Sequence, residues 1–364
     1  MLFDSSLRRE LARSFGVTLV VLVTVVMTMT LIRTLGQASR GGFNPSDVTL
    51  VMGYTVLAYL PTLLALGLFI AVIASLSRMY RDSEMVIWFC SGRGLFSVLA
   101  SLLRFAWPVL LVIAALSLFV LPWSNGRVQE LKARYEQRGD LERIMPGQFQ
   151  ESANGSRVFF VEKNLEAGRT GSNVFIVTTE KNRQTITSAR SGRIETLPHG
   201  QFLVLHNGQR LESALDSSEL KLSEFESYSV QIRNRAVTAA PSVPVKTRST
   251  LELLADPVAV HRGELAWRFG MVLAAFNFVL IGALVSSVNP RVNQGVNLVF
   301  ALFAFVVYFN LLNLGQSWVA TGKLGLLRHM LALHGGVFLL GLVWMSVKHF
   351  GWAWPRLFRG RAAT

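Results

Sequence analysis

Four charged residues stand together in the stretch RMYRDSE, between two apolar runs. Arg78, Arg81, Asp82 and Glu84 supply guanidinium and carboxylate groups of the kind that pair with one another or with a protein partner. They include no nucleophile with an adjacent base, which covalent catalysis requires. The chemistry predicted for this cluster is recognition through ion pairs rather than bond breaking.

An apolar segment follows the charged cluster. Met85, Val86, Trp88 and Phe89 would form one face of a short helix, which the glycines at 92 and 94 would end. Such a helix could lie on the membrane surface. The acidic residues of the cluster favour docking onto a soluble protein instead, because an anionic inner leaflet repels carboxylates.

Metal, redox and nucleotide chemistry have little support elsewhere in the sequence. The one cysteine, Cys90, excludes an intrachain disulfide and a cysteine-based metal site, and the six histidines show no ligand spacing. No GxxxxGK[ST] phosphate loop is present, since Gly322-Lys323 is followed by Leu324. We therefore expect a chain that is not an enzyme and that holds no cofactor itself.

The composition is that of a membrane protein. Of 364 residues, 51% are hydrophobic and 16% are charged, whereas ordinary soluble domains are about 25% charged. The net charge of +14 is uneven: residues 122–258 contribute only +2 and the rest of the chain +12. A basic excess beside apolar runs indicates membrane topology, and no basic-aromatic pattern typical of a nucleic-acid groove is found.

Six apolar runs are long enough to span a bilayer of about 30 Å. The first, residues 15–32, carries no charge, and a cleaved signal peptide is the alternative interpretation for it. The other five are residues 48–77, 105–123, 267–288, 296–319 and 330–347.

The distribution of basic residues predicts the orientation. With the N-terminus inside, the inner segments hold twelve Lys and Arg residues: Arg8, Arg9, Arg13, Arg78, Arg81, Arg93, Arg104, Arg291, Lys348, Arg356, Arg359 and Arg361. The short outer segments hold six: Arg33, Arg40, Arg262, Arg268, Lys323 and Arg328. Both termini are thus predicted to be cytoplasmic, and the insert after the third span is predicted to lie outside.

That insert has the alternating pattern of an all-β domain. After a helical lead-in at 126–137, alternating runs end at turns predicted at Asn154-Gly155, Ser191-Gly192 and Asn207-Gly208. Asn154-Gly155-Ser156 also fits a glycosylation acceptor. The predicted fold is an α-helical membrane protein with six transmembrane helices, three before and three after an inserted β domain. Its parts are residues 1–123, 124–260 and 261–364, the last with a basic tail.

Seven motifs carry a resemblance to a known family. In chain order they are SRMYRDSEMVIWFCSG, PWSNGR, PGQFQ, NGSRVFFVE, ELAWR, SSVNPR and GKLGL. Their order and spacing resemble the lipopolysaccharide-export permease family of the LptF/LptG type over nearly the whole chain. PGQFQ and NGSRVFFVE are more similar to the LptF type. One departure is Gly92-Arg93-Gly94, where the family commonly has Gly-Leu/Ile-Ser, so the next helix lacks a serine N-cap.

The resemblance implies a permease subunit of an ATP-binding-cassette transporter in the bacterial inner membrane. It would extract lipopolysaccharide from the outer leaflet and pass it to a periplasmic β-jellyroll bridge. The implied partners are an LptG-like paralogous permease, an LptB-like ATPase dimer that binds ATP and Mg²⁺, and LptC- and LptA-like jellyroll proteins. The inserted domain becomes a periplasmic jellyroll-like domain, and residues 80–94 become a coupling helix. Glu84 would contact the ATPase, supported by Arg81, Asp82 and Met85.

The resemblance also implies that basic residues at the outer rim contact lipid phosphates. The candidates are Arg33, Arg40, Arg262 and Arg268. For Arg33 the alternative is a charge that anchors the helix at the interface. For Arg268 the alternative is a pair with Glu264, four residues earlier on the same helix.

Three other function classes compete with transport of this kind. A membrane-anchored periplasmic scaffold would not need a charged segment at the inner surface. A secondary transporter would be expected to have carboxylates in its spans, and residues 15–32 and 296–319 have none. An intrinsic membrane enzyme would need a nucleophile-base pair or paired carboxylates, for which these residues give no argument.

Overall fold

The computed structural model describes the chain in ten stretches: residues 2–39, 43–137, 149–151, 157–162, 170–180, 183–197, 200–214, 220–234, 243–286 and 294–349. The chain divides into two compact units. One comprises Met1–Ile32, Thr49–Gln129 and Val243–Thr364, and contains most of the helical structure. The other comprises Arg33–Val48 and Glu130–Ser242, and contains the β-sheet.

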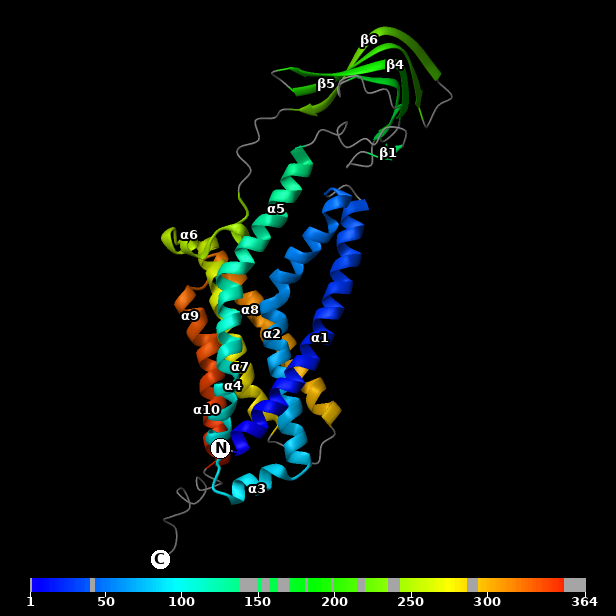
Figure 1. Cartoon of the computed structure of the whole chain (residues 1–364). Coiled ribbons are helices and arrows are strands. Elements are labelled where there is room, and N and C mark those ends of the chain that lie inside the picture. The colour runs from blue at the N-terminus through cyan, green and yellow to red at the C-terminus, as the bar shows by residue number, and fades with distance from the viewer. Residues whose placement is uncertain are drawn as a thin grey trace, which may run out of the picture. The chain divides into compact units, whose positions relative to one another are not determined.

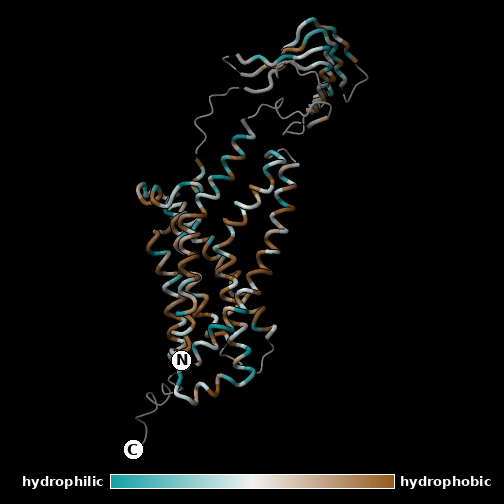
Figure 2. Tube along the Cα trace, viewed as in Figure 1, coloured by the Kyte–Doolittle hydropathy of each residue, from teal (hydrophilic) through white to brown (hydrophobic). Residues whose placement is uncertain are grey.

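Six helical segments are long and apolar enough to cross a membrane, as predicted. They are α1 (Leu2–Ser39), α2 (Val48–Arg81), α4 (Leu95–Ala115) with η2 (Leu116–Val120) and α5 (Leu121–Gln137), α7 (Ala259–Ser286), α8 (Gln294–Ala320), and α9 (Leu326–Met330) with η4 (Leu331–Gly335) and α10 (Gly336–His349). Figure 2 shows their middle stretches as mostly hydrophobic, whereas the last turns of α5 are hydrophilic. Short helices η1 (Pro45–Asp47) and α3 (Glu84–Cys90) lie between the first three spans, and η3 (Val245–Thr247) and α6 (Thr250–Ala255) lie between β6 and α7.

The third helix is longer than its apolar run predicts. It begins at Leu95, ten residues before the predicted span, and continues through the π-helical turn η2 to Gln137. Gly94 is its N-cap and makes no side-chain hydrogen bond there, as expected from the missing serine. The helical lead-in predicted at 126–137 is confirmed.

α7 lies at the centre of the helical unit. In the most apolar 18-residue stretch of α7, 72% of the residues are buried. The buried share of the corresponding stretch is 6% in α1, 22% in α8 and 17% in the last span. The ring of Phe278 stacks on Phe69 of α2 at 4.9 Å and contacts Phe305 of α8 at 5.1 Å. A Cβ at Gly282 would lie only 2.8 Å from Val72, so α2 and α7 pack closely there. Many apolar side chains of α1 and α8 are exposed, among them Val20, Ile32, Val299 and Phe303, and lipid or another subunit can cover them.

The insert is one antiparallel sheet with strands in sequence order. The strands are β1 (Gln150–Glu151), β2 (Arg157–Glu162), β3 (Thr170–Glu180), β4 (Arg183–Leu197), β5 (Gly200–Ala214) and β6 (Leu220–Asn234). Figure 1 shows this sheet as strongly curved. The predicted all-β insert is confirmed, including its five main strands.

Two predicted turns are wrong. Ser191-Gly192 lies inside β4 and Asn207-Gly208 inside β5, while Asn154-Gly155 lies outside the described residues. Asn207 does take the positive φ that its sequence favours, at 52°. It uses this conformation to bend a strand rather than to reverse the chain.

The bend crosses four neighbouring strands. At the bend, one residue of each of these strands has no partner on the neighbouring strand: Asn173, Arg190, Asn207 and Glu226. Side chains meet across this crease, since a Cβ at Gly192 would lie 3.0 Å from Val174 and 3.3 Å from Leu203. The sheet thereby encloses a small core of its own, made of Val174, Ile176, Ala189, Leu203 and Leu205.

Candidate functional site

The short helix α3 is separated from the helices before and after it by two residues in the left-handed conformation. Ser83 has a φ of 59° between α2 and α3, and Gly92 has a φ of 84° after α3. Gly92 N donates to the Phe89 carbonyl and Arg93 N to the Trp88 carbonyl, which is the pairing of a Schellman C-cap. Gly92 therefore ends the helix, as its position in the sequence predicts.

Arg78, in the last turns of α2, joins three carboxylates to one guanidinium. Its Nε lies 3.0 Å from Glu10 of α1, and its Nη1 lies 2.9 Å from Glu84 and 3.4 Å from Asp82. Arg81 pairs with Asp82 at 3.3 Å. The structure thus brings the predicted cluster together around Arg78, with Glu84 at the first residue of α3.

α3 presents an apolar surface outward. Met85 is fully buried, whereas Val86 and Ile87 are 58% and 68% exposed, and Phe89 is also exposed. The predicted apolar face is therefore divided, with Met85 fixing the helix to the protein and its neighbours facing away. α3 is not part of the six candidate spans, so this surface is suited to a protein partner or the membrane surface.

The basic residues predicted at the outer rim differ in their surroundings. Arg33 is exposed near the end of α1, and no hydrogen bond or ion pair joins its guanidinium to another described residue. Arg262 is exposed in the first turn of α7. Arg40 lies outside the described residues. Arg33 and Arg262 therefore keep charges that a ligand could reach.

Arg268 is different, and the expectation that it contacts lipid does not fit this structure. Its side chain is fully buried, and its Nε donates to Glu264 at 3.1 Å. Nη1 donates to Thr250 Oγ1 at 2.8 Å, and Nη2 to the carbonyl of Arg248 at 3.0 Å. The pair with Glu264, weighed above as the alternative, is present in this structure, and burial keeps the charge from any lipid in this conformation.

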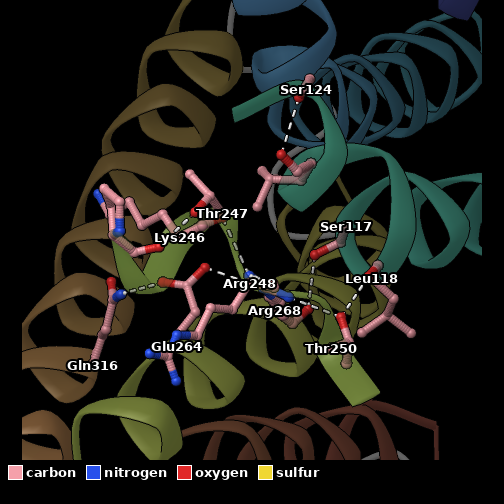
Figure 3. A network of polar contacts seen from close by, with 12 residues as sticks. Ser117, Leu118, Ser124, Lys246, Thr247, Arg248, Thr250, Glu264, Arg268 and Gln316 are labelled. Atoms are coloured by element: carbon pink, nitrogen blue, oxygen red, sulfur yellow. Dashed lines mark hydrogen bonds and ion pairs between the residues drawn. The ribbon is translucent and has the colours of Figure 1, made fainter. Parts of the chain in front are cut away.

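The network around Arg268 joins four elements (Figure 3). Glu264 also accepts a hydrogen bond from Gln316 of α8 at 3.2 Å, and Ser117 of η2 donates to the backbone carbonyl of Arg268 at 3.0 Å. Thr250 donates to the carbonyl of Leu118 within the π turn. A π turn disturbs the regular helical hydrogen bonds of the backbone. The hydroxyl of Thr250 supplies a hydrogen bond to one of the carbonyls in this turn. The segment 245–250, which follows β6 in sequence, is thereby fixed to α7.

Two acidic residues of α1 were not identified from the sequence. Glu10 and Asp4 contact Arg78 and Ser101, which are 68 and 97 residues away. No local spacing signals such a pairing, although both acids stand out in a basic N-terminal stretch. Within the described residues, no group of three or more metal-ligating side chains comes together.

We predict that Arg268→Met destabilises the helical unit. Removing one partner of a buried ion pair costs about 3–5 kcal/mol, because the other charge stays buried. Thermal unfolding of the purified chain in detergent measures the loss, and hydrogen exchange over residues 243–258 should rise.

The matched control is Arg262→Met on the exposed face of the same helix, expected to change stability by less than about 0.5 kcal/mol. The double variant Glu264→Leu/Arg268→Met should recover much of the loss, since apolar replacement of a buried pair is often neutral. Equal effects of Arg268→Met and Arg262→Met would contradict the role of the network.

Comparisons with known proteins agree with this architecture. The family described as "Lipopolysaccharide export system permease LptF/LptG" matches residues 6–348. The chain is 25% identical over 328 residues to the lipopolysaccharide export system permease protein LptF of Escherichia coli (strain K12), covering 89% of each chain. The protein of the same name from Shigella flexneri matches equally. The chain belongs to the lipopolysaccharide export permease family LptF/LptG.

Proposed function

We propose that this chain is the permease subunit of an ATP-binding-cassette transporter that extracts lipopolysaccharide from the outer leaflet of the inner membrane. The observation that carries the proposal is α3, a short helix outside the spans with acidic residues at its start and exposed apolar residues behind them. A permease without a phosphate loop of its own needs such a surface to receive force from an ATPase.

The proposed ATPase contact combines charge and apolar area. Glu84 lies at the N-terminus of α3 with its carboxylate only part-buried, beside the exposed Val86 and Ile87. A partner that presents a cation to Glu84 and an apolar pocket to Ile87 would bury both. Arg81, Asp82 and Met85 support the site, Met85 by anchoring α3. ATP and Mg²⁺ are bound by that partner.

The orientation follows from the basic residues. Positive charge collects on the cytoplasmic face of membrane proteins, and this rule places both termini and α3 in the cytoplasm. An odd number of spans then separates α3 from the insert in the chain, so the insert is periplasmic. The outward-facing apolar residues of α1 and α8 give a paralogous permease, in addition to lipid, a surface to pack against.

The lipid contact is proposed at basic residues of the outer rim. Arg33 follows the apolar run of the first span, Arg40 comes seven residues later in the sequence, and Arg262 begins the fourth span. A guanidinium at this level can pair with the phosphates of the lipid head group while the acyl chains stay in the membrane. Arg268 has a structural role instead.

The β insert is proposed to receive the lipid and continue the bridge. A hollow of about 870 Å³ in the sheet is lined by four phenylalanines, which suit acyl chains, and also by polar and charged side chains that include Arg190, Glu224 and Glu226. β6, at the end of the strand order, pairs only with β5 among the described strands. Its other edge could accept a strand from a periplasmic jellyroll protein.

We predict that Glu84→Arg uncouples the ATPase. The reversed charge would repel both Arg78 and the partner's cation, so stimulation of ATP hydrolysis should fall about tenfold or more, with membrane insertion intact. Co-purification of the ATPase and ATP hydrolysis by the assembled transporter measure this. The control is Glu252→Arg, an exposed acid of α6. Unchanged assembly, hydrolysis and lipid export would refute the coupling role of Glu84.

We also predict that Arg33→Glu weakens lipopolysaccharide binding at the first span. Loss of a charge-assisted hydrogen bond of about 1.5 kcal/mol corresponds to roughly a tenfold fall in occupancy. A photo-crosslinking residue at Ile32, which is exposed, reports the lipid directly. Arg13→Glu, exposed on the same helix, is the control. An unchanged crosslink in Arg33→Glu would assign Arg33 to membrane anchoring.

A further inference from the structure

The start of α1 differs from the exposed middle of the first span. Leu7 and Leu11 are buried, with exposures of 1% and 0%, whereas Val20 and Ile32 further along the helix are more than 60% exposed. Asp4, Leu7, Glu10 and Leu11 recur at spacings of three, four and seven residues, so they share one helix face. The first turns of α1 therefore pack firmly on the protein, as Thr30, Thr34 and Ala38 do near the other end of the helix.

Two polar contacts flank the buried leucines. Glu10 accepts from Arg78 Nε at 3.0 Å. Asp4 accepts from Ser101 Oγ of α4 at 2.5 Å and lies 3.6 Å from Arg93 in the segment after α3. Arg93 also donates to Ser97 of α4 at 3.1 Å. The first turns of α1 thus contact the chain on both flanks of α3, at the end of α2 and at the beginning of α4.

Arg78 makes this contact sensitive to what binds α3. One guanidinium faces Glu10, Asp82 and Glu84. A partner's cation that paired with Glu84 would leave this guanidinium to Glu10 and Asp82 alone, which would strengthen its pairing with α1. Binding at the docking surface would therefore change how α1 is attached to the protein. The lipid-facing side chains of α1 need not take part in this change.

We propose that residues Asp4–Leu11 form a brace that positions α3 and transmits its movement to the first span through the Glu10–Arg78 ion pair. Glu10 and Asp4 are positioning residues and do not touch the partner or the lipid. This inference rests on the proposed function of α3 as the ATPase contact. The two buried leucines hold α1 in place, so loss of the ion pair should change coupling and not the fold.

The test is Glu10→Gln in the transporter assembled with its co-expressed ATPase and paralogous permease, reconstituted in vesicles containing lipopolysaccharide. A part-exposed ion pair is worth at most about a fivefold effect. We expect lipopolysaccharide released per ATP hydrolysed to fall about two- to fivefold, while co-purification of the ATPase is unchanged. Glu10→Arg, which places two like charges together, should lower the ratio further. Arg9→Gln, an exposed neighbour on α1, should leave the ratio unchanged.

The double variant Glu10→Gln/Arg78→Gln distinguishes an action through Arg78 from an independent one. If the brace acts through the ion pair, the double variant is no worse than Arg78→Gln alone. An unchanged ratio in Glu10→Gln, or loss of the ATPase from the assembly, overturns the brace. Neither result touches the docking proposal, which fails if Glu84→Arg leaves ATPase assembly, ATP hydrolysis and lipid export unchanged.

Discussion

A protein interior does not accept an uncompensated charge, and the helical unit is arranged around this constraint. Glu264 and Arg268 are buried in the fourth candidate span and are paired with each other. Arg268 also donates to Thr250, and Glu264 also accepts from Gln316. This pairing also fixes the segment that follows the β insert in sequence onto α7, the most buried helix. The same residues that neutralise a charge therefore determine where the chain returns from the insert.

The charges available for function consequently lie at helix ends. Near α3 three carboxylates share the single guanidinium of Arg78. Arg78 can therefore lose one of these partners and still be paired with the others. A polar cluster of this kind is suited to transmit a force, because its contacts are individually weak and easily rearranged. Arg33 at the other end of the first span is exposed, and α1 between the two is apolar over its middle stretch.

Much of the fold could be predicted because membrane spans and strands have strong local signals. The six spans follow from uninterrupted apolar runs, and the five main strands follow from alternation. The turn predicted at Asn207-Gly208 was wrong because a positive φ, which Asn207 does take, is used for a crease as readily as for a turn. The turn predicted at Ser191-Gly192 was wrong because these two residues continue β4 without a positive φ. Glu10–Arg78 and Asp4–Ser101 depend on helices packing across long sequence separations, which no spacing reveals. Arg268 shows most clearly where prediction from sequence ends. The sequence is compatible with either lipid or Glu264 as its partner, and only the burial of its side chain decides between the two.

The account depends on α3 being the surface that meets the ATPase, and cysteine crosslinking tests this most directly. In a Cys90→Ser background, Ile87→Cys on α3 and Leu251→Cys on α6 would be compared, since both side chains are well exposed. A crosslink from Ile87→Cys to the co-expressed ATPase, with none from Leu251→Cys, is the expected result. A crosslink to the ATPase from Leu251→Cys and none from Ile87→Cys would contradict the account.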